Sequence, residues 1–183
     1  MDAARVLPYS ELVITILTGP VGSGKTSFLE RNLPSLRGRH PNLDGYLSLR
    51  VLAGGETAGY DLRDLRSAGR ISLLRKRGEA DGFRVGPYVL LPRGLAAAEA
   101  IIRRGDPADL LIVDEVGPLE LAGGGVWPAL IGEILDRDRP ALVVVRETLV
   151  DDIRAALAGR EMKIIRADSE GEPSVLGDLG GRL

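Results

Sequence analysis

The amino-acid sequence predicts an α/β protein with a largely parallel central sheet, and three observations lead to this prediction. Short apolar runs alternate with helical segments along most of the 183 residues. A glycine-rich loop ending in Gly-Lys-Thr separates the first apolar run from the first helical segment. A later apolar run ends in two adjacent carboxylates, Asp114 and Glu115. Together these features predict a three-layer P-loop fold that binds the phosphates of a nucleotide.

The first strand is predicted over residues 12–17, a continuous apolar run typical of a buried parallel strand. The loop after it has the P-loop spacing of one glycine, four residues and then Gly-Lys-Thr. Its residues are Gly19, Pro20, Val21, Gly22, Ser23, Gly24, Lys25 and Thr26. Glycines allow several backbone N–H groups of such a loop to point into one cavity, where they hold phosphates. Ser27 then enters a helix, whose N-terminus adds a partial positive charge to the site.

Lys25 and Thr26 supply the side-chain chemistry of this loop. Lys25 is predicted to bring its charge to the β- and γ-phosphates, and we expect it to face solvent until a phosphate arrives. Thr26 is predicted to offer its hydroxyl to a magnesium ion. The segment from Gly19 to Ser27 is therefore the predicted nucleotide-binding set, and Lys25 is also a candidate catalytic residue.

The middle of the chain predicts short strands and turns. Residues 43–51 form a second strand, residues 53–56 a turn and residues 57–62 an extended segment. Further short apolar runs at 71–74 and 83–85 indicate an antiparallel hairpin element inserted over about residues 53–91. An alanine-rich helix follows over residues 95–104, and Gly105 and Pro107 close it.

Beyond this helix the alternation of strands and helices resumes. Strands are predicted at residues 110–113, 141–145 and 162–165. Helices are predicted between them at 126–137 and 150–157, which implies right-handed crossovers and parallel pairing. The tail from 168 to 183 is rich in Gly and Asp and is expected to be loosely held. We expect the 183 residues to form one domain.

The acid pair is the second chemical motif. In a P-loop fold we expect its strand to lie beside the P-loop strand, with its carboxyl end facing the phosphates. Asp114 is then placed to hold magnesium together with Thr26, directly or through water. Glu115 can polarise a water for attack on the γ-phosphate, which favours hydrolysis over transfer to a second substrate.

Two further residues keep two interpretations each. Glu120 either orients water or metal at this site or belongs to a tight turn begun by Gly117 and Pro118. Arg146 ends the strand at 141–145, where it either stabilises charge in the transition state or is a solvated side chain. Arg146 is kept as a candidate catalytic residue.

Composition excludes several other classes of protein. The chain carries 24 Lys and Arg against 26 Asp and Glu, a net charge of -2, which gives no strong signal for nucleic-acid binding. It has no cysteine, which excludes disulfides, thiolate metal sites and a cysteine nucleophile. No run is long enough to span a membrane and no signal segment is visible, so we expect a cytoplasmic protein. The sequence specifies no protein partner.

The chain resembles the THEP-type nucleoside-triphosphatases, small P-loop proteins of the additional-strand (RecA-like) class. The resemblance spans roughly residues 12–157. Its segments are the P-loop, Asp44-Gly45-Tyr46, Gly59-Tyr60-Asp61, Val85-Gly86-Pro87-Tyr88-Val89 and Asp114-Glu115-Val116-Gly117-Pro118-Leu119-Glu120-Leu121. The resemblance implies magnesium-dependent hydrolysis of nucleoside triphosphates such as ATP and GTP with little preference among bases. The chain departs from the family at Thr57-Ala58 and at Arg166-Ala167-Asp168-Ser169.

Two alternatives remain at this point. The first is a nucleoside or nucleotide kinase, with a basic stretch as its phosphate-binding lid; the stretch comprises Arg63, Arg66, Arg70, Arg75, Lys76 and Arg77. The second is a nucleotide-dependent switch that regulates a partner. A charge run is usually a solvated face, and Glu115 favours the hydrolase over the kinase. The Asn-Lys-x-Asp motif of GTPases is absent, because neither Asn32 nor Asn42 precedes a lysine.

Overall fold

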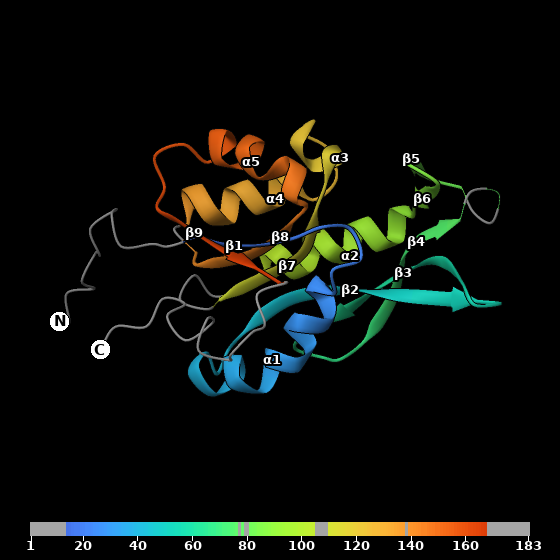
Figure 1. Ribbon diagram of the computed structural model, residues 1–183, viewed down its shortest axis with the longest axis horizontal. Helices are drawn as coiled ribbons and strands as arrows, with labels where there is room; N and C mark the ends of the chain where they lie inside the picture. Colours follow the sequence, from blue (N-terminus) through green and yellow to red (C-terminus); the bar gives the residue numbers. More distant parts are fainter. Residues whose placement is uncertain (1–13, 77, 79–80, 105–109, 138, 168–183) are drawn as a thin grey trace.

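The computed structural model describes residues 14–76, 78, 81–104, 110–137 and 139–167 (Figure 1). Within these residues, nine strands form one sheet in the order β5-β6-β4-β3-β2-β7-β8-β1-β9. The strands are β1 (Ile14–Thr18), β2 (Asp44–Ala53), β3 (Glu56–Asp64), β4 (Arg70–Lys76), β5 (Phe83–Val85), β6 (Tyr88–Leu90), β7 (Leu111–Val116), β8 (Ala141–Val145) and β9 (Met162–Arg166). The helices are α1 (Lys25–Arg39), α2 (Pro92–Arg103), α3 (Pro118–Leu121), α4 (Trp127–Ile131), the π-helical turn η1 (Gly132–Asp136), the 3-10 turn η2 (Glu147–Leu149) and α5 (Val150–Ala156).

The parallel part of the sheet contains β2, β7, β8, β1 and β9. The expectation that the acid strand lies directly beside the P-loop strand is wrong, because β8 lies between β7 and β1. Every residue of β8 is buried, so this strand suits a central position that is covered on both faces. Strand order depends on pairing between distant segments, and the local apolar pattern that located β8 does not specify its neighbours.

The antiparallel part continues the same sheet outward from β2. Strands β3, β4, β6 and β5 are added one after another in antiparallel pairing. The predicted hairpin element is thus a four-stranded extension of the sheet. The turn between β2 and β3 is Gly54-Gly55, with φ of +56° and +84°. Two-residue hairpin turns often require this left-handed conformation, which glycine adopts readily.

Helices cover both faces of the sheet, α1 on one face and α2, α4 and α5 on the other (Figure 1). Alternate side chains of the central strands point to opposite faces. In β8, for example, Val143 and Val145 belong to the core under α2 and α4, whereas Leu142 and Val144 pack against α1. Each face of the parallel strands therefore needs an apolar set, which explains their continuous apolar runs.

Several elements differ in detail from the sequence expectations. Strand β7 runs through the two acids to Val116 instead of ending before them. The helix expected at 126–137 is α4 followed by the π-helical turn η1. The short helix α3 and strand β6 were not expected as elements. Residues 12–13, Gly105, Pro107 and the tail at 168–183 lie outside the described residues.

A cluster of ion pairs around two buried carboxylates joins β2, β3 and the end of α2 at the start of β2. Asp44 is fully buried and Asp64 nearly so. The Arg104 guanidinium donates hydrogen bonds to both carboxylates, at 2.6 Å to Asp44 Oδ1 and 2.5 Å to Asp64 Oδ1. The hydrogen bonds from Arg104 hold the pKa of Asp64 well below its usual value. Arg66 and Arg139 also form ion pairs with Asp44.

We predict that Arg104→Met lowers the free energy of unfolding by about 3 kcal/mol at pH 7, because it leaves buried carboxylates without their main partner. The matched control is Arg103→Met, which removes only an exposed pair with Glu99 and should cost less than about 1 kcal/mol. Urea unfolding measures both. The carboxylate of Asp64 has a lowered pKa in the folded state, so its stabilisation is present above about pH 4 and is lost as the pH falls through that lower value. The difference in the free energy of unfolding between Arg104→Met and Arg103→Met should therefore become smaller at acid pH. Equal losses at pH 7 would contradict the role of the cluster.

Candidate active site

The glycine-rich loop connects β1 to α1 at one edge of the sheet. Gly22 and Gly24 have φ of +81° and +82°, a left-handed conformation that side chains rarely adopt. A Cβ on Gly19 would lie 2.8 Å from Ser23 Oγ, so the loop also closes tightly on itself. The Ser23 hydroxyl is buried and has no hydrogen-bond partner among the described residues. The loop thus curls around a polar interior.

Lys25 lies inside this loop and is only 7% exposed. Its ammonium donates hydrogen bonds to the carbonyls of Gly19 at 3.0 Å and Pro20 at 2.9 Å. The expectation that Lys25 faces solvent before a phosphate binds is therefore wrong. A buried ammonium requires acceptors, and the backbone of its own loop supplies them.

Thr26 and Asp114 meet although 88 residues separate them. The Thr26 hydroxyl donates to Asp114 Oδ2 at 2.8 Å, and the Ser48 amide donates to the same oxygen at 3.2 Å. Asp114 Oδ1 accepts no hydrogen bond from the described residues. Asp114 is 2% exposed, and this burial raises the pKa of its carboxyl to about 7 despite the two hydrogen bonds. The two residues predicted to hold a metal are thus in direct contact.

Glu115 and Arg146 form an ion pair across β7 and the end of β8. Arg146 Nε donates to Glu115 Oε1 at 2.9 Å. The two side chains are 32% and 44% exposed, so water reaches both. The candidate general base and the candidate arginine are thus brought together, one residue away from Asp114.

Glu120 closes the loop that follows β7. Its Oε2 accepts a hydrogen bond from the Gly117 amide at 2.9 Å, which caps the short helix α3. A Cβ on Gly125 would lie only 2.1 Å from Glu120 Oε1, so the carboxylate packs directly over that glycine. Burial raises the pKa of Glu120. These contacts give Glu120 a structural role in the turn.

Several members of the basic stretch form ion pairs with acidic residues. Arg63 pairs with Glu30 at 3.3 Å, Arg75 with Asp61 at 2.6 Å and Lys76 with Glu56 at 2.8 Å. Arg66 pairs with Asp44 in the buried cluster, and Arg77 lies outside the described residues. Four residues of the stretch, Arg63, Arg66, Arg75 and Lys76, are therefore engaged in ion pairs.

Sequence motifs did not indicate Ser48 and Tyr46 as neighbours of the acids. Tyr46 is 2% exposed, and its burial raises the pKa of its hydroxyl, with smaller contributions from the charges of Glu120 and Asp114. Both residues lie on β2, which pairs with β7. In the sequence, only the resemblance of the segment around Tyr46 to a known family pointed to this region, and that resemblance assigned no role to Tyr46.

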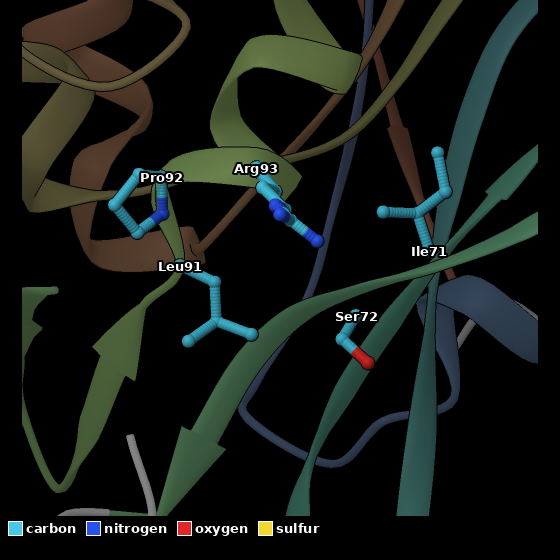
Figure 2. Close-up of a pocket in the computed structure, with 5 residues that line it drawn as sticks. All are labelled: Ile71, Ser72, Leu91, Pro92 and Arg93. Atoms are coloured by element: carbon cyan, nitrogen blue, oxygen red, sulfur yellow. The ribbon is translucent and has the colours of Figure 1, made fainter. Parts of the chain in front are cut away.

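A shallow pocket of about 520 Å³ lies between β4 and the start of α2 (Figure 2). Ile71, Ser72, Leu91, Pro92 and Arg93 line it. The Ser72 hydroxyl already accepts a hydrogen bond from Arg75. No residue of this pocket belongs to the glycine-rich loop or to the acid pair, so it is separate from the candidate active site.

Comparison with known proteins identifies the family. The family model described as NTPase matches residues 14–173. The nucleoside-triphosphatase THEP1 of Thermofilum pendens is 34% identical over 153 residues, which cover 81% of this chain and 83% of that protein. The protein of the same name from Methanopyrus kandleri is 35% identical over 133 residues, 72% of each chain.

Two solved structures share the fold. A human cancer-related nucleoside triphosphatase matches with a TM-score of 0.67 and 24% identity, over 91% of this chain and 94% of that one. THEP1 from the hyperthermophile Aquifex aeolicus matches with a TM-score of 0.67 and 21% identity, over 91% and 96%. The fold and the matches define an α/β nucleoside-triphosphatase. The chain belongs to the NTPase family, and the predictions of this family and of an enzyme are confirmed. In the described residues, no helix has the length and apolar character needed to cross a membrane.

Proposed function

We propose that this chain hydrolyses nucleoside triphosphates to diphosphate and phosphate, with magnesium as cofactor and little preference among bases, on a three-layer P-loop domain formed by the whole chain. The observation that carries the proposal is the 2.8 Å hydrogen bond from Thr26 to Asp114. It joins the glycine-rich loop to the acid pair, so phosphate-binding and water-activating groups share one edge of the sheet.

Residues 19–27 bind the phosphates in this proposal. The loop amides and the N-terminus of α1 favour negative charge, and Ser23 Oγ is an additional donor inside the loop. The Lys25 ammonium now binds two neutral carbonyls. Phosphate oxygens carry charge and accept stronger hydrogen bonds, so Lys25 exchanges the carbonyls for the β- and γ-phosphates.

Thr26 and Asp114 fit a magnesium ion. Magnesium prefers oxygen ligands, and here a hydroxyl and a carboxylate lie side by side with Asp114 Oδ1 uncommitted. The described residues contain no group of three or more His, Cys, Asp or Glu that could hold a metal by itself. Magnesium bound with substrate phosphates needs only one or two protein ligands. When bound, the ion neutralises charge on the β- and γ-phosphates.

Glu115 receives the proton in the proposed reaction. A water oxygen bonds to the γ-phosphorus, the bond from that phosphorus to the bridging oxygen breaks, and the water proton passes to the Glu115 carboxylate. Arg146 orients that carboxylate through its 2.9 Å hydrogen bond. In this proposal the guanidinium also stabilises the charge that develops on the transferred group. A kinase lid built from the basic stretch is not favoured, because its ion pairs already engage Arg63, Arg75 and Lys76.

We predict that ATP and GTP are hydrolysed at comparable rates. The proposed contacts are all to phosphates and magnesium, and the chain has no Asn-Lys-x-Asp motif to recognise guanine. Phosphate release from the four common ribonucleoside triphosphates at equal concentrations measures the preference. A ratio of kcat/KM above about one hundred, near 3 kcal/mol, would reveal a base-binding pocket and contradict this part of the proposal.

We predict that Glu115→Gln and Asp114→Asn impair hydrolysis in different ways. Gln keeps the size of Glu115 but cannot accept a proton, so turnover should fall by about two to four orders of magnitude while nucleotide binding persists. Asp114→Asn should instead raise the magnesium concentration needed for half-maximal activity, because it removes a charged ligand. Single-turnover hydrolysis over a magnesium titration separates the two effects. Wild-type turnover in Glu115→Gln would show that water is activated elsewhere.

A further inference from the structure

Ser48 lies where the pairing between β2 and β7 reaches the acid pair. The two strands pair in parallel at Asp44 with Leu111, Gly45 with Ile112 and Tyr46 with Val113. Two residues further in the same register, the Ser48 amide would meet the backbone carbonyl of Asp114 in a regular parallel ladder. The described pairing instead ends at Tyr46, and Ser48 makes different contacts.

In place of the single hydrogen bond of a regular ladder, Ser48 makes two hydrogen bonds to Asp114. Its hydroxyl donates to the Asp114 backbone carbonyl. Its amide is thereby available for the Asp114 side chain and donates to Oδ2 at 3.2 Å. A hydroxyl at position 48 thus satisfies the carbonyl that the strand amide would otherwise bind. An alanine would keep the amide but leave this carbonyl without the hydroxyl donor.

On its other side, β7 pairs with β8, and the backbone pairing there is irregular at this point. The register between β7 and β8 shifts between Val113 and Val116, so the regular ladder is interrupted at the acid pair. Ser48 therefore fixes the Asp114 backbone from the β2 side, and Thr26 fixes the carboxylate from the loop. Both of these hydrogen bonds to the carboxylate end on Oδ2, so neither donor engages Oδ1.

We propose that Ser48 is a positioning residue that fixes Asp114 in the orientation that binds magnesium. The inference rests on the proposed function, because it takes Asp114 as a metal ligand. In this role Ser48 acts through its hydrogen bonds to the backbone and the side chain of Asp114. Partners that orient metal ligands typically account for about 10- to 100-fold in metal affinity or activity.

The decisive variants are Ser48→Ala, which removes the hydroxyl, and Ser48→Thr, which retains it. Ser35→Ala is the matched control, because Ser35 is an exposed residue of α1. Three readouts are needed: thermal unfolding, binding of a fluorescent ATP analogue in EDTA, and affinity for Mn²⁺ as a spectroscopic stand-in for magnesium, measured by electron paramagnetic resonance with a non-hydrolysable ATP analogue. The magnesium dependence of hydrolysis is measured alongside them.

For Ser48→Ala we expect a 10- to 100-fold loss of Mn²⁺ affinity and a matching rise in the magnesium requirement. Binding in EDTA should stay within about twofold of wild type, because the hydrogen bonds of Ser48 go to Asp114 and not to the glycine-rich loop. Ser48→Thr and Ser35→Ala should both resemble wild type. Unchanged Mn²⁺ affinity in Ser48→Ala would overturn the inference, as would an equal loss in Ser48→Thr or an equal loss of binding in EDTA.

Asp114→Asn, measured in the same way, separates this inference from the proposed function. If Asp114→Asn binds Mn²⁺ like wild type, Asp114 is not a metal ligand, and the proposed function fails at that point. If Asp114→Asn loses affinity while Ser48→Ala does not, only the positioning role of Ser48 is overturned.

Discussion

The hydrogen bond from Thr26 to Asp114 is the contact on which the site depends. It joins the first turn of α1 to the end of β7, two segments 88 residues apart in sequence. Both partners are polar groups in a largely buried place, where each requires a hydrogen-bond partner. The glycine-rich loop and the acid pair are therefore held in one arrangement before a ligand binds. This lowers the free-energy cost of organising the site on binding.

The order of the strands determines which side chains surround this contact. Because β8 lies between β1 and β7, Arg146, which directly follows β8, reaches Glu115, one residue from Asp114. On the other side, β2 brings Ser48 to Asp114. The acid pair is thus supported from both neighbouring strands, by an ion pair at Glu115 and by hydrogen bonds at Asp114. A sheet with β7 directly beside β1 would place Arg146 elsewhere.

Local sequence patterns predicted the loop, the acid pair and most elements, because each depends on a short run of residues. The bounds of β8 were predicted at 141–145, and the glycine turn between β2 and β3 was predicted at its position. The place of β8 in the sheet was not, because non-local pairing sets it. The Arg104 cluster and the contacts of Ser48 likewise depend on residues far apart in sequence. No spacing rule indicates such contacts, so the sequence predicts the candidate site residues better than it predicts the contacts that hold them in place.

A crystal structure with Mg²⁺ and a non-hydrolysable ATP analogue tests the central claim most directly. The account predicts that the metal binds Thr26 Oγ1, at about 2.1 Å, and Asp114, directly or through one water. It also predicts that the Lys25 ammonium has moved from the carbonyls of Gly19 and Pro20 to the phosphates. A metal bound away from Thr26 and Asp114, or phosphates bound outside residues 19–27, would contradict the account.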